Sequence, residues 1–133
     1  MNRLFRIAIA GALCVGVTSA HAYGSGPSSG HCEKPVFSEF QPATNKYIQS
    51  LSEFSMVASS NTTPTSIEVN VSAGQNKYHF SHKELEIKPE ANGRLGISGK
   101  LPRPLGHGFV RISVTAHSKP GCEKTDGYLV RIQ

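Results

Sequence analysis

Short runs in which apolar and polar residues alternate, separated by turn-forming residues, restrict the fold of this chain more than any other feature. The clearest run is SIEVNVS at 66–72, where Ile67, Val69 and Val71 alternate with polar residues. Successive side chains of a β-strand point to opposite faces, so this period of two predicts a strand with one buried face. Further runs of this kind lie at 36–40, 53–59, 77–81, 84–88, 94–101, 109–117 and 128–132.

The segments between these runs are rich in turn residues, and no window shows a helical period of any length. These segments are QPATN, SSNTTPT, SAGQN, KPEANG, PRPLGHG and SKPGCEKTDG. About seven or eight short strands joined by such turns predict an all-β, antiparallel sandwich of two sheets. In the first strand, the alternation places Val36 and Phe40 on one face.

The start of the chain has the three parts of a secretory signal. Arg3 and Arg6 precede an apolar run at 7–17, and AHA at 20–22 places small residues at the −3 and −1 positions of a cleavage site. The apolar run is shorter than the about 20 residues that span a bilayer, so no stable membrane span is expected after cleavage. We expect a signal peptide at 1–22, a flexible Gly/Ser leader at 23–31, and a folded domain at 32–133 of a periplasmic or secreted protein.

Removal of the signal also removes Cys14 and leaves an even pair, Cys32 and Cys122. In an oxidising compartment such a pair predicts a disulfide bond. The two cysteines lack the C-x-x-C spacing of a redox pair, and a zinc site needs two more well-placed ligands. In the chain-entropy model, closing the loop of about 90 residues between Cys32 and Cys122 contributes about 4–5 kcal/mol to stability.

Two longer stretches carry a family resemblance. LPRPLGHGFVRISVTAHSKPGCEKTDGYLVRI and FSEFQPATNKYIQSLSEFSMVASSNTTPTSIEVNV resemble the two halves of bacterial immunoglobulin-like and fibronectin type III-like extracellular modules, over residues 35–132. The resemblance implies an immunoglobulin-like β-sandwich and carries no active site with it. In that topology the first strand begins beside the loop between the last two strands, which makes Cys32 and Cys122 neighbours.

The net charge of +5 is too small to indicate nucleic-acid binding, but its distribution is uneven. Residues 23–93 carry more acidic than basic side chains, whereas basic side chains far outnumber acidic ones over 94–133. One face or edge of the domain is therefore expected to be basic.

This distribution points to a binding surface rather than a reaction centre. The loops SSNTTPT and SKPGCEKTDG are expected to meet at the disulfide end, and the last two strands present Arg111, Thr115, His117, Leu129 and Arg131 outward. The candidate binding residues are Glu68, Arg111, His117, Lys119, Lys124 and Arg131. The predicted function is that of an exported, non-catalytic binding or accessory module for a protein or a glycan. In the alternative, Glu68 simply pairs with one of the arginines.

A periplasmic copper- or zinc-binding protein is the competing interpretation, with His31, His79 and His82 as ligands. Residues three apart on a strand point to opposite faces, so His79 and His82 chelate together only if the strand ends between them. A copper site of His31, His107 and His117 becomes available if cleavage after Ala20 makes His21 the first residue.

No cofactor and no enzymatic activity are expected. The chain has no Gly-x-Ser-x-Gly elbow, and Asp126 is its single aspartate. Glu84 and Glu86 lie on one face of a predicted strand, a pattern typical of solvated surface rather than of an acid-base pair.

Overall fold

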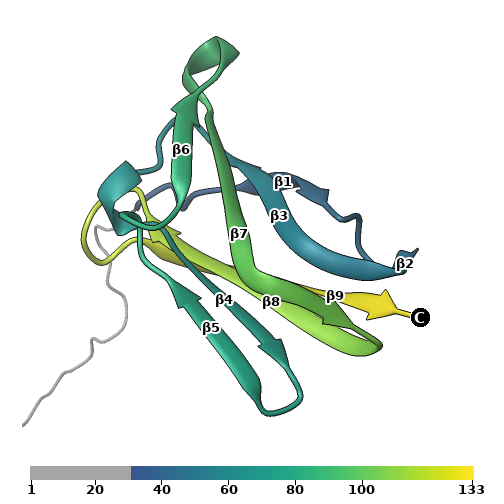
Figure 1. The fold of residues 1–133 in the computed structure, drawn as a ribbon. Coiled ribbons are helices and arrows are strands. Elements are labelled where there is room, and N and C mark those ends of the chain that lie inside the picture. The colour runs from purple at the N-terminus through teal and green to yellow at the C-terminus, as the bar shows by residue number, and fades with distance from the viewer. Residues whose placement is uncertain (1–30) are drawn as a thin grey trace, which may run out of the picture. The chain divides into compact units, whose positions relative to one another are not determined.

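The computed structural model describes residues 31–133, which form two β-sheets packed face to face (Figure 1). The strands are β1 (Phe37–Gln41), β2 (Tyr47–Ile48), β3 (Ser50–Ala58), β4 (Glu68–Ala73), β5 (Asn76–Phe80), β6 (Glu86–Pro89), β7 (Leu95–Gly106), β8 (Gly108–His117) and β9 (Glu123–Ile132). Two short 3-10 turns, η1 (Pro64–Ser66) and η2 (Ala91–Gly93), connect some of them. The predicted signal peptide and nearly all of the predicted leader lie outside the described residues.

The strand order is that of an immunoglobulin-like sandwich. One sheet has the order β1-β3-β7-β6, and the other has the order β2-β9-β8-β4-β5. All neighbouring strands are antiparallel except β2, which pairs in parallel with β9. The predicted fold class is therefore confirmed. The sequence did not predict β2, because this strand has only two residues and no alternation of its own.

The core consists of the inward faces of the two sheets. Ile67, Val69 and Val71 are fully buried, as the alternation at 66–72 predicted. Phe54 of β3 and Phe80 of β5 meet edge to face across the core, with ring centroids 5.2 Å apart. Contacts of this kind between the sheets fix their distance and hold the loops at both ends in place.

The predicted faces of the first strand are wrong. Val36 is 63% exposed, while Phe37 is buried and Phe40 packs against the core. The register to β3 shifts between Ser38 and Gln41, where Glu39 has a φ of 54°. This bulge inserts an extra residue, which changes the parity of the alternation and turns both phenylalanines inward.

Two segments predicted as turns belong in large part to strands. β7 continues through Pro102 and Pro104 to Gly106, and β9 already begins at Glu123. The pairing of β7 with β3 is interrupted between Lys100 and Leu105, so neither proline has to donate a ladder hydrogen bond. The connection from β7 to β8 is thereby reduced to a tight turn at residue 107.

Candidate functional site

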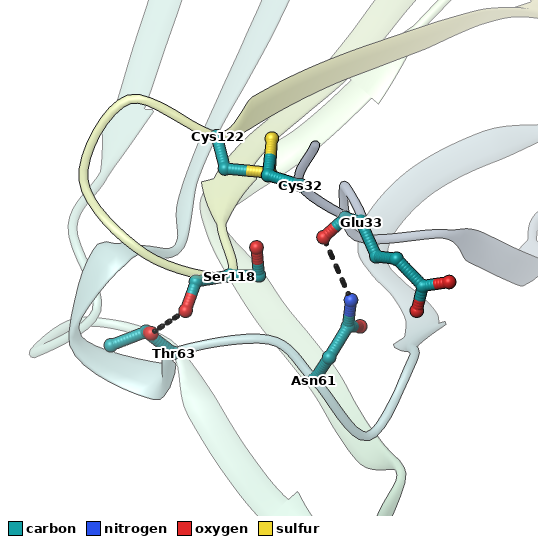
Figure 2. The surroundings of a disulfide bond; sticks show 6 residues. All are labelled: Cys32, Glu33, Asn61, Thr63, Ser118 and Cys122. Atoms are coloured by element: carbon teal, nitrogen blue, oxygen red, sulfur yellow. Dashed lines mark hydrogen bonds between the residues drawn. A yellow bond between two sulfur atoms is a disulfide. The ribbon is translucent and has the colours of Figure 1, made fainter. Parts of the chain in front are cut away.

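The disulfide end of the sandwich joins three segments that lie far apart in the sequence. Cys32 and Cys122 form the predicted bond, with Cα atoms 6.0 Å apart and 90 residues between them in sequence (Figure 2). Cys122 is fully buried in the turn between β8 and β9. The bond therefore fixes the start of the domain to its last hairpin, and it fits an oxidising compartment, periplasmic or secreted.

The loop between β3 and β4 is the third segment at this end. The Thr63 hydroxyl donates a hydrogen bond to the Ser118 carbonyl at 3.0 Å, and the Asn61 amide donates one to the Glu33 carbonyl at 3.0 Å (Figure 2). The Thr63 backbone N–H donates to the His117 carbonyl at 2.9 Å. The predicted meeting of the SSNTTPT and SKPGCEKTDG loops is thus present, and its polar groups bond to one another.

His117 is the chemically distinctive side chain at this end. Its backbone is fixed because its N–H donates to the Ser66 hydroxyl at 3.0 Å and its carbonyl accepts from Thr63. Its Nδ1 atom, however, is buried and has no hydrogen-bond partner among residues 31–133. Buried polar atoms normally have a partner, so the hydrogen-bonding capacity of this nitrogen is unused within residues 31–133. His31, next to Cys32 in the sequence, is exposed.

The histidines of the metal-binding interpretation belong to different parts of the fold. The His79 Nδ1 atom on β5 lies 2.8 Å from the Asn70 Oδ1 atom, and its Nε2 atom lies 3.8 Å from a Glu68 carboxylate oxygen. His82 lies in the turn after β5. Within residues 31–133, no three side chains of His, Cys, Asp or Glu are placed to hold a metal ion together. Glu68 itself lies beside a histidine and not beside an arginine.

Sulfur ligands are also missing from the surface of the described domain. Both of its cysteines are in the disulfide, and Met56 is only 1% exposed in the core. Any metal bound by this part of the chain therefore has nitrogen or oxygen ligands.

A second polar surface lies on the outer face of the five-stranded sheet, toward the far end of β8 and β9. The guanidinium carbon of Arg131 lies 5.3 Å from the centre of the Tyr47 ring and 5.6 Å from that of Phe109. Arg111 is exposed on β8, opposite Leu129 of β9. Both arginines are among the candidate binding residues predicted from the sequence, whereas Tyr47 and Phe109 are not. The alternation already placed Phe109 outward, next to the inward Val110, whereas Tyr47 reaches this face only through β2.

The candidate binding residues therefore do not form one site. His117 is near the disulfide, Lys119 lies in the β8–β9 turn, and Lys124 is exposed near the start of β9. Arg111 is six residues before His117 on the same strand, which corresponds to about 20 Å. Glu68 is the first residue of β4, where it pairs with Thr115 of β8 in register.

The two surface carboxylates considered for catalysis, Glu84 and Glu86, each interact with a residue two or three positions away in the sequence. A hydrogen bond from the Ser81 backbone N–H at 2.8 Å lowers the pKa of Glu84. The Lys88 ammonium, 3.0 Å from Glu86, lowers the pKa of that carboxyl. Neither group is kept protonated as a general acid would be. The absence of catalysis stays a prediction.

The sequence matches no protein-family profile and no curated protein. Two solved structures are similar to this chain in fold. PcoC from Escherichia coli, a methionine-rich copper resistance protein, has a TM-score of 0.52 at 15% identity over 76% of this chain and 100% of PcoC. CopC from Methylosinus trichosporium OB3b has a TM-score of 0.57 at 12% identity over 74% of this chain and 93% of CopC.

At such low identity these comparisons show a shared β-sandwich fold. No family model supports a fibronectin type III module, so the finer part of the sequence resemblance stays a prediction. In the described part of the chain, no helix has the length and apolarity needed to cross a membrane.

Proposed function

We propose that the mature chain is an exported, non-catalytic copper-binding protein with its copper site at the disulfide end. The observation that carries this proposal is the buried, unpartnered Nδ1 atom of His117. The fold shared with PcoC and CopC supports it, because PcoC is a copper resistance protein.

The available ligands determine which oxidation state the site takes. Thiolate and thioether ligands favour Cu(I), whereas imidazole and amine nitrogens in a tetragonal arrangement favour Cu(II). PcoC is named as methionine-rich, but this chain has two methionines, one in the predicted signal and the other buried at position 56. The proposed ion is therefore Cu(II), held by nitrogen.

His31 and His117 are the histidines nearest in the sequence to Cys32 and Cys122, respectively. A tetragonal Cu(II) site needs two further donors. If the signal is cleaved after Ala20, the new first residue His21 supplies both an amino group and an imidazole.

The test is a Cu(II) titration of two forms of the mature protein, one starting at His21 and the other at Tyr23, followed by electron paramagnetic resonance and competition with a chelator. We expect one equivalent of Cu(II) with a nitrogen-rich spectrum in the longer form. H117A should weaken binding by at least about tenfold, as should the start at Tyr23.

H79A is the matched control, because His79 is an exposed histidine whose contacts lie on β4 and not at the disulfide end. It should leave the affinity unchanged. Equal weakening by H79A and H117A, or no stoichiometric Cu(II) in the longer form, would show that the proposal is wrong.

A further inference from the structure

Five side chains form a continuous patch on the outer face of the five-stranded sheet. They are Tyr47, Phe109, Arg111, Leu129 and Arg131, and we call them the aromatic–arginine patch. Phe109, Arg131 and Tyr47 stand in register on β8, β9 and β2, and Arg111 and Leu129 form the next outward pair on β8 and β9. The patch thus occupies two neighbouring rows of the sheet.

The patch concentrates the exposed apolar surface of the described domain. Residues 31–133 have four exposed large hydrophobic side chains, and three of them are here: Tyr47 at 56%, Phe109 at 63% and Leu129 at 39%. Single exposed hydrophobics are common on protein surfaces, but a contiguous group with a polar border is typical of an interaction site.

The side chains of the patch are already held in place. Arg131 lies beside both aromatic rings and donates from Nη1 to the Tyr47 hydroxyl at 2.7 Å. The Arg111 guanidinium lies across Gly127, so closely that a Cβ atom there would come within 2.8 Å of its Nη2 atom. Side chains that are fixed before binding lose less conformational entropy when a partner docks.

The charges of the patch are not balanced within the domain. Arg94, on the other sheet, pairs with Glu39 at 3.0 Å and with Glu90 at 3.7 Å. Among residues 31–133, by contrast, no carboxylate lies within ion-pair distance of Arg111 or Arg131. Arg111 is exposed and Arg131 is half-buried. Accessible guanidinium groups between apolar side chains are well suited to bind carboxylates in charge-assisted hydrogen bonds.

We propose that the aromatic–arginine patch docks an extended acidic segment of another exported protein. Arg111 and Arg131 are diagonal neighbours on adjacent strands, a spacing of about 7–8 Å between backbones. Same-face side chains two residues apart in an extended segment are about 7 Å apart, so two such carboxylates can reach both guanidiniums. An apolar side chain two residues further along packs on Phe109 or Leu129. Fixed arginine and aromatic residues of this kind dominate binding in protein interfaces.

The probe is a capped heptapeptide, Thr-Glu-Thr-Glu-Thr-Leu-Thr, titrated into the isotope-labelled mature protein without copper and followed by NMR. We expect shifts of the backbone and arginine side-chain signals at 109–111 and 129–131. R111Q, R131Q and F109S should each weaken binding by at least about threefold. The same peptide with Gln in place of Glu should not bind.

Two variants are matched controls. R94Q removes a guanidinium that already has two carboxylate partners, and V36S removes an apolar side chain with the same 63% exposure as Phe109. Both should bind the peptide like the wild type. Circular dichroism of every variant confirms that it is folded.

Three outcomes would overturn the proposal: no binding of the acidic peptide, binding that R94Q weakens as much as R111Q, or binding confined to vesicles that contain anionic lipid. The last outcome would assign the patch to a membrane surface instead. None of these results bears on the copper proposal, because the peptide and the copper ion are tested separately at opposite ends of β8.

Discussion

The two ends of the β8–β9 hairpin differ in how their polar groups are satisfied. At the disulfide end, polar groups of three segments form hydrogen bonds with one another. At the far end, arginine and apolar side chains lie accessible to solvent on the outer face of the sheet. Thr63, Asn61 and Ser66 all donate to backbone carbonyls at the first end. Arg111 and Leu129 show the opposite arrangement at the second. The hydrogen bonds at the disulfide end therefore stabilise the domain, whereas the side chains at the far end are available to contact a partner.

The difference also shows how a polar group can indicate function. Many polar atoms at the disulfide end have partners, so the unpartnered Nδ1 atom of His117 is an exception in a well-bonded region. In the aromatic–arginine patch, most side chains are exposed, and the signal is the grouping of residue types, although the Nε atom of Arg131 is also buried without a partner among residues 31–133.

The largest expected effect comes from removing the disulfide. Replacing Cys32 and Cys122 together by serine should lower the free energy of unfolding by about 2–4 kcal/mol, because the unfolded chain then regains loop entropy. Denaturant unfolding of the oxidised wild type and the double variant measures this. A loss below about 0.5 kcal/mol would mean that the hydrogen bonds alone hold the disulfide end together.

Most of the arrangement at the disulfide end follows from the sequence. The even cysteine count after signal removal predicts a disulfide bond, and the topology implied by the immunoglobulin-like resemblance makes Cys32 and Cys122 neighbours. The bond is present. Turn residues in SSNTTPT and SKPGCEKTDG located the loops that meet there. The unpartnered state of His117 could not be predicted, because it depends on the packing around one ring atom.

Only part of the aromatic–arginine patch could be predicted from the sequence. Alternation places Arg111 and Arg131 outward, but Tyr47 joins them through a two-residue parallel strand that has no pattern of its own. The bulge at Glu39 was missed for a similar reason, since one residue in a left-handed conformation reverses the alternation without changing the composition.

A smaller loss of stability is expected when a single hydrogen bond at the disulfide end is removed. T63V keeps the shape of the side chain but removes the donor to the Ser118 carbonyl, which should cost about 1 kcal/mol. Thr65, in the same turn, is exposed, and T65V should change stability by less than about 0.5 kcal/mol. Thermal and denaturant unfolding of both variants test this difference, and equal effects would remove the special role of Thr63.

At the patch, the expected effect on stability is close to zero. F109S removes an apolar side chain that is 63% exposed, so the free energy of unfolding should stay within about 0.5 kcal/mol of the wild-type value. The same unfolding assay measures it. A loss above about 1 kcal/mol would mean that the Phe109 ring stabilises the sheet by covering Arg131, and the patch would then resemble the disulfide end.

The smallest expected effect concerns Glu84, a carboxylate that has a hydrogen-bond partner within the domain. It appears only in how stability depends on pH. The Ser81 backbone N–H bonds to Glu84 and holds the pKa of this carboxyl below its ordinary value of 4.5. A carboxyl whose pKa is lower in the folded state stabilises the fold above the unfolded pKa and loses that contribution as the pH falls through the folded pKa. Stability should therefore be slightly more sensitive to acid below about pH 4.5 in the wild type than in E84Q.

Unfolding curves of the wild type and E84Q at pH 7 and pH 3 test this difference in acid sensitivity. A larger acid sensitivity in E84Q would mean that Glu84, like the arginines of the patch, has no effective partner within the domain.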